Sequence, residues 1–278
     1  MGLRPSRGVR LVASGALLLI TAPLLALYAW LPIAAFAERT VGLRPEGFTL
    51  EHWRRLLEPL GGETLLGALA RSLVLSSLYC LLLLAAVVPA AYALSRLSLP
   101  GRRALLVLFL LLHAFPTLSL LVGVYQVLRW FGLYDSLLGV ALIKAASEVS
   151  LGVWVLKGFF DRIPWEMEAA ALVDGGSRWL AFRRICLPLA RPGLLAVGAF
   201  GFLSGWNEFL LPYLFLPSSS HWTLPVYVRA LIADFRFVDY GVVAAASLVY
   251  AAPPLALFAL GQRYLLRVYS LGGRVQAQ

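Results

Sequence analysis

Long apolar runs separated by short polar segments dominate the chain. Six of these runs reach the roughly 20 residues that a helix needs to cross about 30 Å of hydrocarbon. None shows the strict alternation of apolar and polar residues that is typical of the strands of membrane barrels. The pattern predicts an all-α, polytopic membrane protein with six transmembrane helices. These helices are expected at residues 11–36, 64–94, 104–126, 138–160, 193–216 and 241–265.

Composition supports the membrane class. Of the 278 residues, 60% are hydrophobic and only 14% are charged, whereas an ordinary soluble domain has roughly a quarter charged residues. The net charge of +10 would suggest a nucleic-acid partner in a soluble protein. A nucleic-acid patch needs a polar domain with basic and aromatic residues interleaved, and the chain has no such domain, so we expect a lipid bilayer as the partner and no nucleic acid.

Basic residues are distributed unevenly between the segments that connect the runs. Fifteen Lys and Arg residues lie before the first run, after the second, between the fourth and fifth, and after the sixth, whereas seven lie in the other connections. Cytoplasmic loops carry the excess of positive charge, so we expect both termini and residues 161–192 in the cytoplasm. A secretory signal is the alternative for the first run, but the run exceeds the about 7–15 residues of a signal core.

The connection after the first run contains a short amphipathic pattern. In TLEHWRRLLEP, residues 49–59, apolar residues recur at helical spacing after a Thr cap and before Pro59, which predicts a helix at the outer interface. Packing on the membrane surface and a specific binding role both stay open for it. The predicted organisation is an N-terminal helix with this interfacial segment (1–63), a core of five helices (64–267) and a cytoplasmic tail (268–278).

The segment between the fourth and fifth runs predicts a helix-turn-helix. Pro164 suits a first helical turn, WEMEAAALV is rich in helix formers, and glycines at 175–176 interrupt it. Ser177 can then cap a second helix, in which Trp179 and Phe182 offer a large area to hold the segment against its neighbours. Small Ala side chains on the first helix leave room for another surface to approach.

The spacing of this segment resembles the signature of the membrane-spanning subunits of ABC importers. That signature is Glu-Ala-Ala, three residues, Gly, nine residues, Ile, any residue and Leu-Pro. One position differs, because the glutamate of the frame falls on Ala169 and Glu168 stands one residue earlier, about 100° away around a helix. In the family this coupling helix docks into a cleft of the cytoplasmic ATPase, and its glutamate pairs with a basic residue there. The docking residues implied here are Glu168, Ala169, Ala170, Ala171, Asp174, Gly175, Gly176, Ile185, Leu187 and Pro188.

The resemblance extends over nearly the whole chain and is strongest to the carbohydrate branch, similar to the maltose-type six-span subunit. AYALSRLSLPGRR at 91–103, FFDRIPWEME at 159–168 and GWNEFLLPYLFL at 205–216 carry it together. It implies a type I ABC importer permease (MetI-like) fold and import of a di- or oligosaccharide. The implied partners are a second permease subunit, two copies of an ATPase subunit and an extracytoplasmic solute-binding protein.

The chain has no G-x-x-x-x-G-K-[ST] phosphate loop. ATP and Mg are therefore expected on the partner ATPase, and we expect neither a catalytic residue nor a cofactor on this chain. The three histidines are far apart and lack the spacing of metal ligands, so a metal site is not expected.

Polar residues inside the predicted spans are candidates for a substrate path, because ionisable groups within a membrane usually face a cavity or a partner. Lys144 and Glu148 are four residues apart and can pair on one helical face, which leaves a local ion pair and a role in the path equally open. In the fifth run an indole lies beside amide and carboxylate groups, a chemistry that suits sugar binding. The candidate path residues are Tyr125, Gln126, Lys144, Glu148, Trp206, Asn207 and Glu208.

Residues 217–240 resemble the segment that reaches into the binding protein in relatives. The resemblance implies a contact through Ser219, His221 and Trp222, and an ordinary polar connection is the alternative.

Two other functions stay open. A polytopic lipid or glycosyl transferase would need a cluster of acidic or His residues at one membrane face, which the scattered Asp and Glu residues do not provide. The same transporter class could also carry a polyol or a glycerol phosphate, and one sequence does not decide the cargo.

Overall fold

The computed structural model describes residues 7–42, 44–233 and 238–275, and the chain divides into two compact units. The first unit comprises Met1–Leu60 and Val228–Pro253, and the second comprises Gly61–Tyr227 and Pro254–Gln278. The elements that begin in the first unit are α1 (Arg7–Phe36), β1 (Arg39–Val41), β2 (Arg44–Glu46), α2 (Glu51–Leu56) and α13 (Tyr240–Val275), the last of which continues into the second unit.

The first unit returns the chain from the end of α1 through a short hairpin to α2. β1 and β2 pair antiparallel, with Arg39 opposite Glu46. The ring of Phe36 stacks on Phe48, with ring centroids 5.7 Å apart, and also contacts Trp53 at 5.5 Å. This aromatic cluster holds the return segment against the end of α1. The predicted short helix in residues 49–59 is confirmed as α2, and the hydroxyl of Thr49 accepts a hydrogen bond from the backbone N–H of Glu51 at 3.0 Å.

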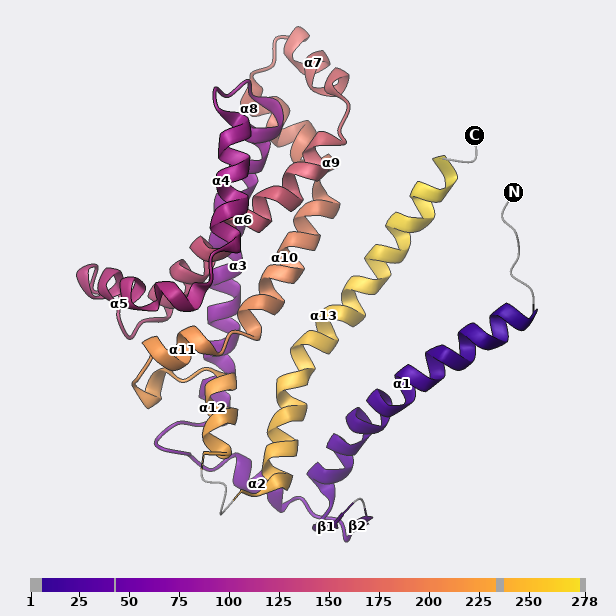
Figure 1. Cartoon of the computed structure of the whole chain (residues 1–278), viewed down its shortest axis with the longest axis vertical. Coiled ribbons are helices and arrows are strands. Elements are labelled where there is room, and N and C mark those ends of the chain that lie inside the picture. The colour runs from indigo at the N-terminus through magenta and orange to yellow at the C-terminus, as the bar shows by residue number, and fades with distance from the viewer. Residues whose placement is uncertain (1–6, 43, 234–237, 276–278) are drawn as a thin grey trace. The chain divides into compact units, whose positions relative to one another are not determined.

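The second unit is built around the long helices α3 and α6, which lie side by side, with α10 packed along α3 (Figure 1). Its core contains Tyr79, Leu83 and Val87 of α3 together with Val153 and Phe160 of α6. Its elements are α3 (Leu65–Arg96), α4 (Arg102–Ala114), η1 (Thr117–Leu120), α5 (Leu121–Trp130), α6 (Leu137–Asp161), α7 (Trp165–Val173), α8 (Arg178–Ala181), η2 (Phe182–Cys186), α9 (Leu187–Leu189), α10 (Arg191–Trp206), α11 (Leu210–Phe215), η3 (Ser219–His221) and α12 (Leu224–Leu231), whose last turn lies in the first unit.

Four described helices are long and apolar enough to cross a membrane, and two bent helix pairs raise the number to six if each pair is one span. The four continuous spans confirm the predicted helices at 11–36, 64–94, 138–160 and 241–265. They are Val12–Phe36, Leu65–Arg96, Leu137–Asp161 and Tyr240–Gly261.

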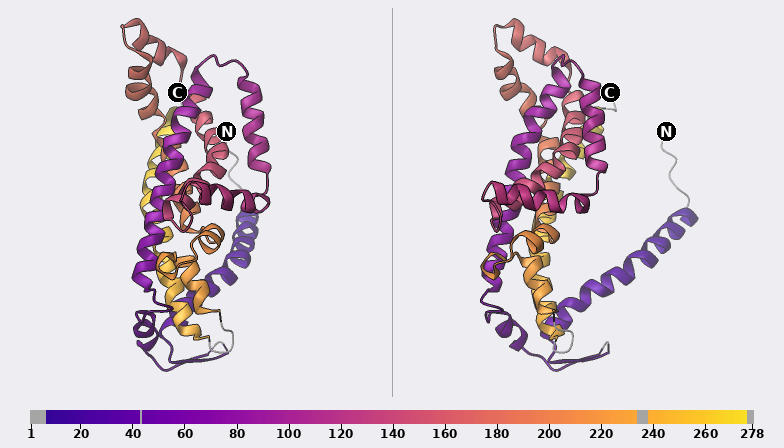
Figure 2. Two further views of the ribbon diagram at one scale, coloured as in Figure 1. Left: turned by 90° about the vertical axis from the view of Figure 1, so that its left-hand side faces the viewer. Right: turned by 60° about the vertical axis from the view of Figure 1, so that its left-hand side comes forward.

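The third predicted helix is not continuous. α4 ends at Ala114, and the chain resumes as η1 and α5 after a bend of 89°, so that α5 runs across the direction of α4 (Figure 2). Pro116 causes the break, since proline has no N–H to donate and pushes the preceding residue out of the helical region. Phe115 is accordingly extended, with ψ 128°.

The fifth predicted helix, 193–216, is also divided. α10 stops at Trp206, and α11 begins at Leu210. The Glu208 side chain accepts a hydrogen bond from the backbone N–H of Leu211 at 3.1 Å, which stabilises the start of the second helix. The helix that leads into α10 is bent as well, by 71° between Arg178–Leu189 and Arg191–Trp206.

Close contact between α3 and α6 depends on Gly152. A Cβ atom at this position would lie 2.7 Å from Cγ2 of Val87, whereas one at Gly158 on the same helix would meet nothing within 4 Å. We expect Gly152→Ala to lower the free energy of unfolding by about 1–3 kcal/mol because the added methyl group overpacks the interface. Gly158→Ala is the matched control and should be neutral or stabilising by up to about 1 kcal/mol, as alanine favours helix. Thermal unfolding of the purified protein in detergent compares the two, and equal melting temperatures would contradict the packing described.

Candidate functional site

Residues 161–192 form the helix-turn-helix that the sequence predicts. α7 begins after Pro164 and ends before a turn in which Gly175 has φ +84°, a left-handed conformation that glycine adopts without strain. The N–H of Gly176 bonds to the carbonyl of Ala171 at 2.9 Å. Ser177 then caps α8, because its hydroxyl accepts a hydrogen bond from the N–H of Leu180 at 3.2 Å. The segment lies at one end of the second unit (Figure 1).

The exposed surface of this segment includes several apolar side chains. Val173 is 86% exposed and Trp179 is 66% exposed, and Met167 and Ala170 are exposed on α7. We refer to Met167, Ala170, Val173 and Trp179 as the loop tip. Large apolar groups that stay in contact with solvent on a folded segment are typical of a surface that another protein covers.

Glu168 points away from the loop tip and into the second unit. Only 1% of the residue is exposed. One carboxylate oxygen accepts a hydrogen bond from the hydroxyl of Tyr92 at 2.6 Å, and the other lies 3.5 Å from Nε of Arg96. The thiol of Cys186 is 3.6 Å from the same carboxylate. Glu168, which the resemblance implies as a docking residue, is therefore not part of the exposed surface, because α7 directs its side chain toward α3.

Arg96 also connects this buried carboxylate to α6. Its Nη2 donates to the carbonyl of Phe160 at 2.7 Å and to that of Ile163 at 2.5 Å. Phe160 belongs to the last turn of α6, where helix carbonyls favour a positive charge, and Ile163 lies two residues beyond the end of the helix. One guanidinium group therefore joins α3, the end of α6 and α7.

Aromatic packing holds the second half of the segment. The Phe182 ring contacts Tyr92, with ring centroids 4.6 Å apart, and lies 6.5 Å from Phe160. The prediction that Phe182 anchors the segment is confirmed by this packing and by its 8% exposure. The same prediction for Trp179 is wrong. Trp179 covers one face of Phe182 at 5.3 Å, but most of its surface points outward.

The other docking residues that the resemblance implies are either exposed or partly buried. Asp174 and Gly175 are exposed in the turn, and Ala169, Ala171 and Gly176 are partly buried. Farther along, Ile185, Leu187 and Pro188 are partly buried, and Cys186 between them is fully buried.

A second polar network crosses the core at Lys144. Its ammonium group lies 2.7 Å from Glu148, one turn away, and 2.8 Å from Glu208, beyond the end of α10. Glu148 also accepts hydrogen bonds from the hydroxyls of Ser204, at 2.7 Å, and Tyr79. The predicted pair between Lys144 and Glu148 is confirmed, and the structure adds partners from α3, α10 and the α10–α11 connection.

The remaining path candidates lie in different surroundings. Trp206 is completely buried and packs beside Phe202 with centroids 6.3 Å apart, so its indole face is not available to a sugar and this candidate is wrong. Asn207 next to it is exposed. Tyr125 and Gln126 are exposed on α5, where Tyr125 contacts Tyr134 edge-on at 5.3 Å.

The segment after α11 is tied to the start of α6 through Asp135. The carboxylate accepts a hydrogen bond from Ser218 at 2.5 Å and lies 3.0 Å from Nδ1 of His221. Burial disfavours the charged carboxylate, but the contacts with Ser218 and His221 outweigh it and hold the pKa of Asp135 below its usual value. Ser219 and Trp222, the neighbouring contact candidates, are partly buried.

Comparison with known proteins shows the family to which this chain belongs. Residues 67–267 match the family described as binding-protein-dependent transport system inner membrane component. The chain belongs to this family. It is therefore an inner membrane permease component of a binding-protein-dependent transport system, as the coupling-helix spacing predicts.

Individual relatives agree with the family. The permease is 33% identical over 231 residues to the inner membrane ABC transporter permease protein YcjP of Escherichia coli, an alignment that covers 83% of this chain and 82% of the relative. It is 30% identical over 225 residues to the trehalose transport system permease protein SugB of Mycobacterium tuberculosis, covering 81% of each chain. The fold matches a chain of a bacterial ABC transporter involved in the import of the polysaccharide alginate, with TM-score 0.80, 21% identity and coverage of 95% of this chain and 99% of that one.

Sequence reasoning missed several members of the two networks. In the sequence, Arg96 is one of the basic residues that favour the cytoplasmic side, and no local pattern relates Tyr79, Tyr92 or Ser204 to these networks. Within the described residues of the permease, no group of three or more His, Cys, Asp or Glu side chains is arranged to hold a metal ion.

The pair of Glu168 and Arg96 gives a stability prediction. Replacing one partner of a buried ion pair leaves the other charge uncompensated, which costs about 3–5 kcal/mol. We therefore expect Glu168→Gln to lower the unfolding free energy of the permease by about 3 kcal/mol, measured by thermal unfolding in detergent. Glu166→Gln, on the exposed side of the same helix, should leave it unchanged. If both variants melt together with the parent protein, the buried pair does not hold the segment.

Proposed function

We propose that this chain is one of two permease subunits of an ATP-driven, binding-protein-dependent importer of a di- or oligosaccharide. The observation that carries the proposal is the loop tip, an exposed apolar surface on a helix-turn-helix that is itself fixed firmly to the core. A segment that is attached firmly to the core and has an uncovered apolar face can bind another protein there and transmit that protein's motion to the transmembrane helices.

In this proposal the loop tip docks on a cytoplasmic ATPase subunit, two copies of which serve the two permeases. Both termini and residues 161–192 lie on the cytoplasmic side, in keeping with the excess of Lys and Arg there. This chain then performs no ATP chemistry, and ATP with Mg binds to the ATPase partner. Closure of the ATPases moves residues 164–186 as a rigid body, and the shared cavity opens alternately to the two sides of the membrane.

The substrate path in this proposal includes Asn207 after α10 and Tyr125 and Gln126 on α5, whose side chains are exposed. Lys144, Glu148 and Glu208 instead hold their helices together, since all three charges are paired within the network. Amide and phenol groups at the path surface can exchange hydrogen bonds with sugar hydroxyls as the water around them is displaced.

The carbohydrate cargo is supported by the relatives. The Mycobacterium tuberculosis relative is named for trehalose transport, and the alginate transporter has the same fold. The solute-binding protein is proposed to contact this subunit near η3, through Ser219, His221 and Trp222. His221 is suited to this role because the side chain is held by Asp135 and is still 41% exposed.

Docking at the loop tip can be tested by inserting one charge. Ala170→Glu places a carboxylate in the middle of the exposed face of α7, where burial against a partner would leave it unpaired at a cost of several kcal/mol. We expect this variant to lose the ATPase on copurification by about tenfold or more. Ser98→Glu adds the same charge to an exposed position between α3 and α4 and should retain the ATPase. Equal retention by both variants would contradict docking at the loop tip.

The cargo can be tested on the binding protein encoded with this permease. We expect disaccharides or short oligosaccharides to raise its melting temperature in a ligand screen, because a ligand that binds only the folded state stabilises it. The screen includes polyols and glycerol phosphate as competing cargoes. A response to these alone, or to no sugar, would contradict the carbohydrate assignment. Turnover of a lipid or sugar donor by the purified permease alone would instead favour a membrane transferase.

A further inference from the structure

The first unit contains a pocket between the ends of two of its helices. The pocket has a volume of about 1130 Å³ and is lined by the last turns of α1, the β1–β2 hairpin, α2 and the first turns of α13. Typical ligand pockets have about 300–1,000 Å³. We call this feature the α1–α13 pocket. Its size admits a ligand considerably larger than a single ion or a small polar group.

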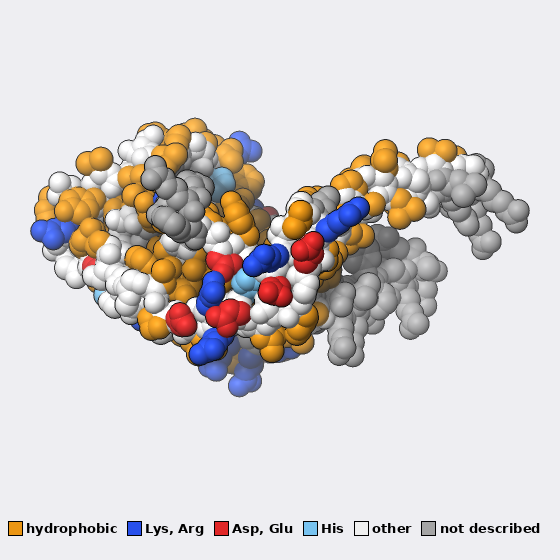
Figure 3. Space-filling model, turned by 90° about the horizontal axis from the view of Figure 1, so that it is seen from below, with side chains coloured by type: hydrophobic (Ala, Val, Ile, Leu, Met, Phe, Trp, Pro, Cys, Tyr) orange, Lys and Arg blue, Asp and Glu red, His pale blue; other side chains and the backbone are white. Residues whose placement is uncertain are grey.

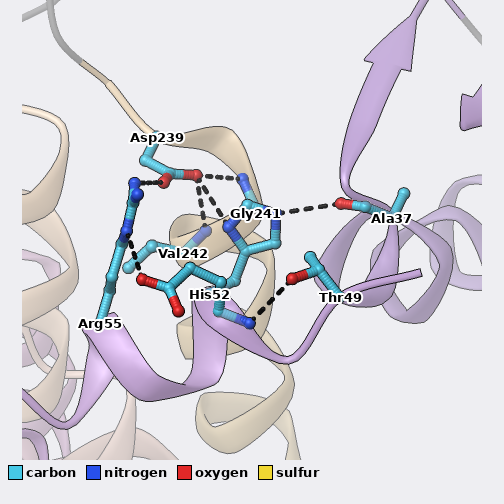
Figure 4. A network of polar contacts seen from close by, with 8 residues as sticks. Ala37, Thr49, His52, Arg55, Asp239, Gly241 and Val242 are labelled. Atoms are coloured by element: carbon cyan, nitrogen blue, oxygen red, sulfur yellow. Dashed lines mark hydrogen bonds and ion pairs between the residues drawn. The ribbon is translucent and has the colours of Figure 1, made fainter. Parts of the chain in front are cut away.

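The walls of the pocket are fixed by a polar network (Figure 4). His52 of α2 lies with Nε2 3.0 Å from the carbonyl of Ala37 and with Nδ1 3.3 Å from Asp239. Arg55, one turn later, lies 3.1 Å from the same aspartate and 3.3 Å from Glu51. The network connects the end of α1, α2 and the start of α13, so the pocket is a built feature of this unit.

The pocket changes from apolar to charged along the direction of the helices. Apolar residues line it within the helices, namely Trp30, Leu31 and Ala34 of α1 and Val243 and Ala244 of α13. α1 ends at Phe36 and α13 begins at Tyr240, so at 1.5 Å per residue the lining reaches about 9 Å into α1 and, at Ser247, about 10 Å into α13. This depth agrees with the about 5–10 Å over which amphipathic groups enter the boundary between headgroups and acyl chains.

The charged rim contains two groups that the network does not use. Glu38 and Arg39 both line the pocket, both are exposed, and neither forms an ion pair or a side-chain hydrogen bond within the described part of the chain. By contrast, Arg55 and Asp239 are paired with each other. Figure 3 shows this end of the molecule, with acidic and basic side chains next to one another. A ligand that meets this rim encounters one available positive charge beside one available negative charge.

We propose that the α1–α13 pocket binds a zwitterionic glycerophospholipid whose headgroup carries a primary amine, as phosphatidylethanolamine does. Arg39 pairs with the phosphate, and Glu38 accepts hydrogen bonds from the ammonium group. The glycerol and the upper part of the acyl chains lie against Trp30, Leu31 and Ala34. A bound lipid of this kind fills the space between the ends of α1 and α13 without removing a charge from the network of His52, Arg55 and Asp239.

The charges on the rim make the proposal selective. An anionic lipid such as phosphatidylglycerol offers a phosphate to Arg39 but only neutral hydroxyl donors, without a positive charge, to Glu38. Phosphatidylcholine offers a positive charge whose methyl groups cannot donate a hydrogen bond to a carboxylate. The amine headgroup should therefore bind more tightly than both, although all three lipids share the same acyl chains.

The test is native mass spectrometry of the full-length chain in detergent, with dioleoyl phosphatidylethanolamine, phosphatidylcholine or phosphatidylglycerol added in equal amounts. We expect the ethanolamine lipid to be retained about tenfold better than the other two. Arg39→Ala should weaken binding of all three lipids, whereas Glu38→Gln should abolish only the preference for the amine headgroup. These different outcomes separate the role of each side chain from a general loss of fold, and unchanged thermal unfolding of both variants provides a second check.

Matched controls come from exposed charges outside the pocket. Arg44→Ala and Glu58→Gln remove the same charges, and neither residue lines the pocket, so both variants should bind the ethanolamine lipid like the parent chain. Equal retention of the three lipids by the parent chain would overturn the proposal. The proposal would also be overturned if the control variants changed lipid retention as much as Arg39→Ala and Glu38→Gln do. Neither result would touch the proposed transport function, which is tested on other residues.

Discussion

The buried pair of Glu168 and Arg96 fixes the 161–192 segment to the helices of the second unit. A charge removed from solvent costs several kcal/mol unless it is paired and hydrogen-bonded, and here the carboxylate meets both the guanidinium and the hydroxyl of Tyr92. Arg96 in turn bonds to the carbonyl of Phe160 in the last turn of α6 and to that of Ile163 just beyond it. α7 therefore cannot leave α3 and α6 without exposing an unpaired charge, and a displacement of the loop tip moves these helices with it.

The network at Lys144 joins α3 and α6 a second time, a few turns away from the pair of Glu168 and Arg96. α3 supplies Tyr79 there and Tyr92 and Arg96 at the loop, while α6 supplies Lys144 and Glu148. Between the two networks the helices approach closely where Gly152 meets Val87. Two sets of paired charges and a tight apolar contact make the α3–α6 pair the rigid frame against which α7, α10 and α11 pack. In the proposed function, this frame is what carries motion from the loop tip toward the path.

Features encoded by neighbouring residues were predictable from the sequence, and features that join distant residues were not. The apolar runs gave α3 and α6, Ser177 gave the cap of α8, and the spacing of Lys144 and Glu148 gave their pair, because each depends on residues within a few turns. Glu208 joins that pair from the α10–α11 connection, and Tyr92 lies 76 residues from Glu168, so no local pattern relates them. The break at Pro116 had a local signal, but the surrounding apolar residues made one continuous span the simpler interpretation.

In the proposed function, the orientation of α7 lets the segment meet its partner while its buried acid, Glu168, is turned inward. At about 100° per residue, positions 166, 170 and 173 share one face of the helix, and Glu168 lies about 200° away from Ala170, on the opposite face. Ala169, where the family frame has its glutamate, stands between these faces and is partly buried. The outward face consequently presents Ala170 and Val173 together with the exposed carboxylate of Glu166. In the proposed function the partner meets this face, and Glu168 holds the segment in place from behind.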